Sequence, residues 1–297
     1  MAVDSVPRLF FGQDMDRADI YPFAGGAAAV FSAKSPTRES SNEDSAGIIP
    51  MGNGAGILAV ADGMGGGAAG EHASQLAIQT LKDSIKSVRG KDIALRTAIL
   101  NGIEAAHQAV FDLGVGAATT LAVAEIQNQT VRTYHVGDSM ILLVGGRGKI
   151  KLQTVSHSPV GYAVEAGVLD EAEALHHEDR HLVSNVVGLS NMRVEIGSAI
   201  ELHPRDTLLL ASDGLFDNLH IQEIVDRVRK GSLEKAVQQL ACDACERMTE
   251  PISGQPSKSD DLTFVAYRMQ TPSRNRTTVN GNSTSTGDPH GVARKSA

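Results

Sequence analysis

Two apolar segments of this sequence end in the same way, in a small residue, an aspartate and a glycine. The segment "GILAVADG" ends at Asp62 and Gly63, and the segment "DTLLLASDG" ends at Asp213 and Gly214. Continuous apolar runs of this length predict strands that are buried on both faces. An ionised carboxylate is rarely buried without a partner. If the two strands lie side by side, their carboxylates need a cation between them or a raised pKa.

The rest of the sequence predicts an α+β fold around these strands. Two amphipathic helices follow Asp62, over 70–88 and 91–113, and each ends at a glycine. A β-rich stretch over 119–155 has short polar turns, which indicate antiparallel neighbours. Residues 157–181 are polar and irregular and are typical of an inserted flap. The other predicted elements are strands at 25–36, 45–49, 182–187, 192–200, 206–212 and 262–269 and helices at 220–230 and 232–249.

More carboxylates lie at the ends of predicted strands. The pair Glu43-Asp44 precedes one strand, the pair Asp260-Asp261 precedes the last strand, and Asp138 lies in a Gly-Asp turn between two strands. Hard divalent cations such as Mg²⁺ and Mn²⁺ take oxygen ligands, and a glycine such as Gly63 leaves room for a carbonyl or a water beside the ion. Each motif alone is more often a loop or a turn. Together they predict a two-metal site that activates water and polarises a phosphoryl oxygen.

Composition excludes several classes of protein. The 297 residues, 41% of them hydrophobic, suit one large domain or two modest ones. A net charge of −8 gives no basic footprint for nucleic acid or an acidic membrane surface. The N-terminus lacks the features of a signal peptide, and no apolar run approaches the roughly 20 residues of a membrane-spanning helix. We therefore expect a cytoplasmic protein that binds neither nucleic acid nor membrane.

The glycine run after Asp62 has a second interpretation. Residues 63–68 match G-x-G-x-x-A, a dinucleotide-binding fingerprint. That fingerprint needs a second parallel strand with an acidic residue about 20 positions further on, and this position falls near Asp83, inside a predicted helix. Asp62 would also repel a pyrophosphate. A P-loop is excluded because no Gly-Lys-Ser/Thr follows.

Cysteine and histidine motifs have a structural and a metal-binding interpretation. Cys242 and Cys245 form C-x-x-C within a helical pattern, and we expect two small residues that face the core rather than a zinc or redox site. His176, His177 and His181 lie in the predicted flap. A zinc site there is an alternative, although three histidines in a polar segment are more often solvated.

Six motifs, in this order, make the sequence similar to the metal-dependent serine/threonine protein phosphatases of type 2C (PPM), in their bacterial form. The matching pieces are "NED" (42–44), "VADGMGG" (60–66), "GAATTLAVAEI" (116–126), "HVGDS" (135–139), "LLLASDGLFDNL" (208–219) and "SDDLTFV" (259–265). The resemblance implies an α-β-β-α sandwich of two antiparallel sheets flanked by helices. It divides the chain into an extension (1–24), a phosphatase domain (25–270) and a tail (271–297). The tail contains no aromatic residue, and we expect it to be disordered.

The resemblance also implies a role for each site residue. Asp62 would bridge two ions, Mn²⁺ or Mg²⁺, with the Gly63 carbonyl acting through a water. The remaining metal residues would be Asp213 and Asp260 at one ion, Glu43 and Asp44 at the other, and Asp138 with Asp213 at a third, weaker ion. The implied reaction is in-line attack of metal-held hydroxide on a phosphoserine or phosphothreonine ester, without a phosphoenzyme. Phosphorylated proteins would be the substrates, and a cognate serine/threonine kinase would supply them.

Two positions depart from the family pattern. The arginine that grips the substrate phosphate is expected where this sequence has Glu39, and Arg38 lies one residue earlier. A one-residue bulge would give Arg38 that catalytic role, because a planar guanidinium fork suits phosphate. Met64 stands where many eukaryotic members have a histidine that protonates the leaving group, and methionine cannot donate that proton. A non-catalytic binding module with the same fold is the remaining alternative.

Overall fold

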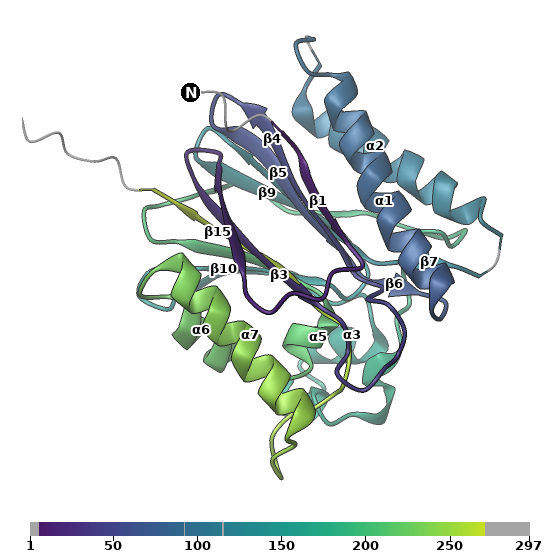
Figure 1. The fold of residues 1–297 in the computed structure, drawn as a ribbon, viewed down its shortest axis with the longest axis vertical. Coiled ribbons are helices and arrows are strands. Elements are labelled where there is room, and N and C mark those ends of the chain that lie inside the picture. Colours follow the sequence, from purple (N-terminus) through teal and green to yellow (C-terminus); the bar gives the residue numbers. More distant parts are fainter. Residues whose placement is uncertain (1–5, 92, 115, 271–297) are drawn as a thin grey trace, which may run out of the picture.

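The structure, a computed structural model, describes residues 6–91, 93–114 and 116–270. Two antiparallel sheets pack face to face, with helices on both outer faces (Figure 1). The first sheet contains β1 (Arg8–Phe11), β4 (Ser45–Gly52), β5 (Ala55–Ala61), β8 (Leu121–Gln127), β9 (Thr130–Val136), β12 (Glu195–Ile196) and β13 (Ile200–Glu201). The second contains β2 (Asp19–Phe23), β3 (Gly26–Ala33), β15 (Leu262–Met269), β14 (Thr207–Ala211), β10 (Met140–Val144) and β11 (Ile150–Gln153). The predicted tail lies outside the described residues.

Two helices cover each outer face of the sandwich. Helices α1 (Ala68–Ser87) and α2 (Leu95–Phe111) lie over the first sheet, and α6 (Ile221–Val228) and α7 (Leu233–Thr249) lie over the second (Figure 1). Short elements connect these layers: β6 (Gly63–Met64), β7 (Ala118–Thr119), α3 (Pro159–Glu165), α4 (Glu171–Ala174), the 3₁₀ helix η1 (Glu178–His181) and α5 (Asp213–Phe216). None of the described helices is both long and apolar enough to cross a bilayer.

The order of the layers follows from the alternation of side chains along the strands. In β5, Ile57 and Ala59 pack under α1 and α2, while Leu58 and Val60 face the second sheet. In β15, alternate residues likewise contact the first sheet or α7. Both faces of a central strand are therefore apolar and buried. The predicted α-β-β-α sandwich is confirmed.

The N-terminal boundary differs from the prediction. Residues 1–24 were expected to be an extension, but β1 pairs with β4 and β2 pairs with β3, so each sheet takes one edge strand from this segment. Both strands are short, and Pro22 in β2 removes a main-chain donor, which an edge strand tolerates. Because the strands are short and one contains a proline, the sequence pattern did not predict them.

Several local predictions also need correction. Strands were predicted at 182–187 and 192–200, whereas this region contains a single bridge from Val187 to Thr119 and the short β12 and β13. Cys245 packs against the core as expected, but Cys242 is exposed. The strand pairs of the described residues are antiparallel, and α1 leads into α2 rather than into a parallel strand. The dinucleotide-binding alternative therefore has no structural support.

Candidate metal centre

Asp62 is held by its main chain at the end of β5. Its N–H donates to Thr120 Oγ1 (2.9 Å), and its carbonyl accepts from Thr119 Oγ1 (2.8 Å) and from the Thr120 N–H (2.9 Å). Thr120 Oγ1 also shares a hydrogen bond of 2.6 Å with Ser139 Oγ, in the turn that carries Asp138. The "TT" of the "GAATTLAVAEI" motif thus fixes two of the predicted site residues relative to each other.

Glu43 is fixed by contacts with the glycine-rich segment. Its Oε1 accepts from the Gly67 N–H (2.8 Å), and its own N–H donates to Asp261 Oδ2 (2.8 Å). A Cβ at Gly63 would overlap the main chain of Gly70, and a Cβ at Gly70 would overlap the Glu43 carboxylate. Glycine is needed at both positions because the start of α1 passes directly against the loop that carries Glu43.

Asp213, Asp217 and Asp260 share one ammonium group, that of Lys258. Lys258 Nζ contacts the Asp213 carboxylate and lies 3.0 Å from both Asp217 Oδ2 and Asp260 Oδ2. The main chain of Lys258 is held by the buried side chain of Asn218, which donates to its carbonyl (2.9 Å) and accepts from its N–H (2.8 Å). Asn218 belongs to the "LFDNL" motif, so that motif positions Lys258 across the loop.

Most of these side chains line one cavity of about 540 Å³, which we call the acidic cavity; Asp217 lies next to it. It brings together residues from the ends of several strands, from loops and from the flap: Arg38, Glu43, Asp62, Gly63, Met64, Asp138, His181, Asp213, Lys258 and Asp260. All but one of the predicted site residues are therefore neighbours here. The exception is Asp44, which is buried behind the cavity, where Ser212 Oγ donates to its Oδ2 (2.7 Å).

The carboxylates of this region repel one another. Burial, followed by repulsion from Asp44, Asp213 and Asp138, raises the pKa of Asp62 well above its ordinary value. Burial and the charge of Asp213 raise the pKa of Asp138 to about 7. Burial and Asp213 likewise raise the pKa of Asp217 to about 6. Like charges at close range produce such shifts when positive charge is insufficient.

Lys258 supplies part of the missing positive charge. Burial acts to lower its pKa, but the charges of Asp213, Asp217 and Asp260 outweigh burial and raise the pKa, so the ammonium stays charged. Among the described residues, Asp217 Oδ2 is buried without a hydrogen bond, since Lys258 Nζ faces it only as an ion pair. An all-oxygen donor set with excess negative charge fits hard divalent cations.

Arg38 lies at the rim of the acidic cavity. Its Nη1 is 3.2 Å from Asp260 Oδ1, and its side chain is 46% exposed. The guanidinium therefore reaches the cavity from a position one residue out of the family register. Its role in binding phosphate stays a prediction, as do the metal-ligand roles of the carboxylates.

Sequence reasoning did not place three groups at this centre, and one of them, His181, was considered only as an alternative zinc ligand in the flap. Asp217 was inside a quoted motif, four residues after Asp213, which places both on one side of α5. The sequence around Lys258 gave no sign that this lysine faces the aspartates, because its position depends on hydrogen bonds from Asn218. His181 is on the flap, and its Nδ1–H donates to the Glu178 carbonyl (2.9 Å). No described residue bonds its Nε2.

A separate group of side chains has the composition of a metal site. Within the described residues, ligand atoms of His135, His157 and Glu195 lie within 4.8 Å of one another. One nitrogen of each histidine already has a main-chain partner: His135 Nε2 donates to the Val155 carbonyl (3.0 Å), and His157 Nδ1 accepts from the Gly137 N–H (3.1 Å). Burial lowers the pKa of both imidazoles. The group thus anchors the turn before Asp138.

The flap histidines were the other predicted alternative for a zinc site. There, His177 Nδ1 accepts a hydrogen bond from the Asp179 N–H (3.1 Å).

Comparison with known proteins identifies the family. The family model for protein phosphatase 2C matches residues 34–251. A protein phosphatase 2C-type protein of Streptococcus pyogenes is 32% identical over 212 residues, which cover 68% of this chain and 85% of that protein. The chain belongs to the protein phosphatase 2C family, and the resemblance seen in the motifs is confirmed. The protein is a metal-dependent phosphatase of the bacterial type.

Solved structures agree with this assignment. The serine/threonine phosphatase of S. agalactiae has a TM-score of 0.70 and 26% identity, and the match covers 82% of this chain and 99% of that one. The catalytic domain of the phosphatase PstP, solved in complex with two manganese ions, has a TM-score of 0.61 and 26% identity, over 81% of this chain and 96% of that one.

Proposed function

We propose that this protein hydrolyses phosphoserine and phosphothreonine esters of proteins by in-line attack of water-derived hydroxide, without a phosphoenzyme. The observation that carries the proposal is the acidic cavity, where the carboxylates of Glu43, Asp62, Asp138, Asp213 and Asp260 face one space with a single ammonium among them. Two bound divalent cations, Mn²⁺ or Mg²⁺, would supply activated water and Lewis-acid stabilisation of the phosphoryl group.

Each carboxylate has a proposed place around those cations. Asp62, whose main chain is fixed by Thr119 and Thr120, would be the residue shared by both cations. Asp213 and Asp260 would hold one cation and Glu43 the other, and the Gly63 carbonyl would contribute through water. Asp44 supports this set from behind. Asp138, with Asp213, would serve a third cation.

Two further residues act on the substrate. Arg38 approaches the cavity from its rim, and its planar fork can bind two phosphate oxygens. His181 enters from the flap, and as an imidazolium it can give its Nε2 proton to the leaving alkoxide. This assigns to His181 the role that Met64 cannot perform, and solvent then returns the proton.

The activity can be tested with a small aryl phosphate and a phosphothreonine peptide. We expect hydrolysis of both with Mn²⁺ or Mg²⁺ and none in excess chelator, with full recovery when the ion is restored. Activity that persists in chelator would contradict the metal-dependent mechanism. Absence of hydrolysis with every divalent ion, in a folded protein, would support the alternative of a non-catalytic module.

The cellular setting is also a proposal. A phosphoprotein phosphatase needs a serine/threonine kinase that supplies its substrates, so we infer that the protein acts with a cognate kinase in the cytoplasm. Recovery of its phosphoprotein substrates from cytoplasmic extracts of cells that lack the phosphatase would support this setting.

A further inference from the structure

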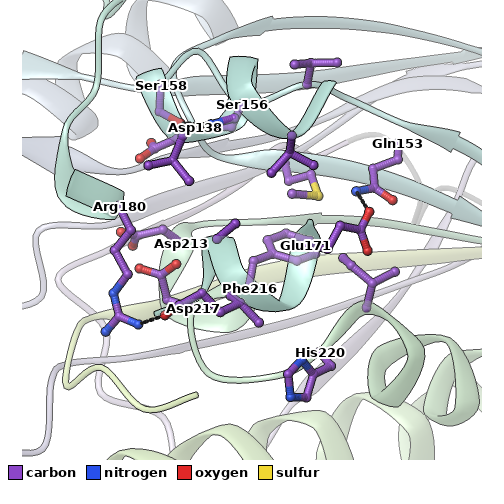
Figure 2. A pocket seen from close by; sticks show the side chains of 18 of the residues that line it. Asp138, Gln153, Ser156, Ser158, Glu171, Arg180, Asp213, Phe216, Asp217 and His220 are labelled. Atoms are coloured by element: carbon purple, nitrogen blue, oxygen red, sulfur yellow. Dashed lines mark hydrogen bonds between the residues drawn. The ribbon is translucent and has the colours of Figure 1, made fainter. Parts of the chain in front are cut away.

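A second cavity of about 540 Å³ adjoins the acidic cavity, and we call it the flap pocket. The two cavities share Asp138 and Asp213. Figure 2 shows these two aspartates and Asp217 at one side of the flap pocket and the Gln153–Glu171 hydrogen bond at the other. The pocket therefore leads away from the place where the phosphoryl group is expected to react.

The walls of the flap pocket come from elements far apart in the sequence. Strands β10 and β11 form one wall, α3 and α4 of the flap form the second, and α5 with the start of α6 forms the third. The apolar lining side chains include Met140, Val155, Val164, Leu175, Phe216 and Leu219. Its volume is within the roughly 300–1,000 Å³ that ligand pockets occupy, so a large side chain with its neighbouring backbone fits.

The flap is tied to the rest of the molecule, so the pocket exists before any ligand binds. Arg180 donates through Nη1 to the Leu175 carbonyl, within the flap, and through Nη2 to the Ser257 carbonyl (3.1 Å). At the other end, the Ser184 N–H donates to the His157 carbonyl (2.9 Å). A preformed pocket reduces the ordering cost of binding.

The charges around the pocket select against acidic groups. Its charged lining contains the carboxylates of Asp138, Glu165, Glu171, Asp213 and Asp217. The one guanidinium, that of Arg180, is directed at two main-chain carbonyls. An acidic side chain would therefore enter a region of like charge, whereas an apolar side chain would bury its surface against the apolar walls.

We propose that the flap pocket binds an apolar side chain of the phosphoprotein substrate, close in sequence to the phosphorylated residue. This inference rests on the proposed function. An extended peptide advances about 3.3–3.6 Å per residue, and the two cavities share two residues, so the side chain belongs within roughly three positions of the phosphothreonine. The flap pocket thus sets which phosphorylated sites are preferred.

A peptide panel tests the proposal on the unaltered protein. The peptides share a phosphothreonine in an alanine-rich background, with leucine, alanine or aspartate at each of the three positions on either side. We expect leucine at one position to raise kcat/KM at least about tenfold over alanine, since even one methylene group in an apolar pocket gives roughly 10–200-fold discrimination. The peptide with aspartate at that position should have a lower kcat/KM than the peptide with alanine there. Equal kcat/KM for all peptides would overturn the proposal.

A matched pair of flap variants links the preference to the pocket. Ala174→Leu fills the pocket from α4, whereas Ala166→Leu makes the same change at an exposed flap position outside it. We expect A174L to remove the leucine preference while A166L keeps it, and both to hydrolyse an aryl phosphate at the original rate. An unchanged preference in A174L would contradict the assignment to this pocket. If the unaltered protein hydrolysed neither the aryl phosphate nor any peptide, the proposed function itself would be overturned, and this inference with it.

Discussion

The acidic cavity and the flap pocket adjoin each other and share Asp138 and Asp213, yet their linings differ in origin. The acidic cavity is built from residues at the ends of strands, where hydrogen bonds such as those of Thr119 and Thr120 fix the main chain. The flap pocket is closed by short helices held by a few hydrogen bonds. On the proposed function, the metal-binding carboxylates belong to the sandwich, whereas the proton donor His181 and the substrate-selecting pocket belong to the inserted flap. Variants of the two regions should separate these properties.

The largest effect is expected for Asp62→Asn, which replaces a carboxylate that lines the acidic cavity. Even residues behind a metal ligand typically contribute 10–100-fold to activity or affinity, so kcat/KM should fall by at least ~10²-fold. The loss should be equal for aryl phosphate and phosphopeptide, because both need the metal pair. Steady-state assays with both substrates measure this.

Asp83→Asn provides the matched control for Asp62→Asn, since Asp83 lies on the exposed side of α1. It should retain full activity. If D62N remained active, or lost activity toward only one substrate, the division between chemistry and selectivity would be wrong.

The next effect is expected for His181→Gln, which lies on the flap but lines the acidic cavity. General acid catalysis contributes roughly 10²–10⁴-fold, so hydrolysis of a phosphothreonine peptide should fall by about 10²-fold. An aryl phosphate has a leaving group that needs no proton, and its hydrolysis should be unchanged. His176→Gln is the control, because His176 is exposed and does not line the cavity. Equal losses for both substrates in H181Q would refute the proton-donor role.

A smaller effect is expected for Arg38→Ala at the rim of the acidic cavity. A hydrogen bond to a charged group contributes roughly 1.5–3 kcal/mol, and partial exposure of Arg38 places the effect at the low end. The KM for the phosphopeptide should rise about tenfold, with a smaller change in kcat. Arg17→Ala, at an exposed position outside the cavity, is the matched control. An unchanged KM would make Arg38 an ordinary surface residue.

Sequence patterns predicted the acidic cavity better than the flap pocket, for a physical reason. A strand that is buried on both faces leaves a continuous apolar run, and a carboxylate at its end stands out. The two Asp-Gly motifs nevertheless continue differently: Asp62 leads into β6, which pairs with β7, and Asp213 begins α5. Contacts with distant residues, such as the pairing of Gly63 with Thr119, determine whether a strand or a helix follows, and the local sequence does not reveal these contacts.

The overlooked features depend on contacts between distant segments. β1 and β2 are short edge strands whose partners are β4 and β3, so no periodicity reveals them. Lys258 joins the aspartates because Asn218 holds its main chain from the other side of a loop. The flap pocket has walls from three separate parts of the chain. Each of these arrangements follows from the fold and not from a motif.

The smallest effect concerns stability in chelator, where protons, Lys258 and the guanidinium of Arg38 offset the repulsion in the acidic cavity. Groups whose pKa is raised in the folded protein stabilise it fully below their unfolded pKa, and this contribution is lost as pH rises through the folded pKa. For Asp138 that window runs from its ordinary value of about 4 to about 7. The melting temperature in chelator should therefore fall by a few degrees between pH 5 and pH 8.

Added Mn²⁺ should reverse this trend, because metal ligands must be deprotonated and the ion favours the charged carboxylates. Lys258→Met should steepen the fall in chelator and enlarge the stabilisation by Mn²⁺, since it removes the one ammonium next to Asp213, Asp217 and Asp260. Lys86→Met, at an exposed position of α1 outside the cavity, should change neither slope. Differential scanning fluorimetry across pH measures all three proteins. A flat or rising melting temperature in chelator would show that the acidic cavity carries no net repulsion, and its proposed demand for cations would lose its basis.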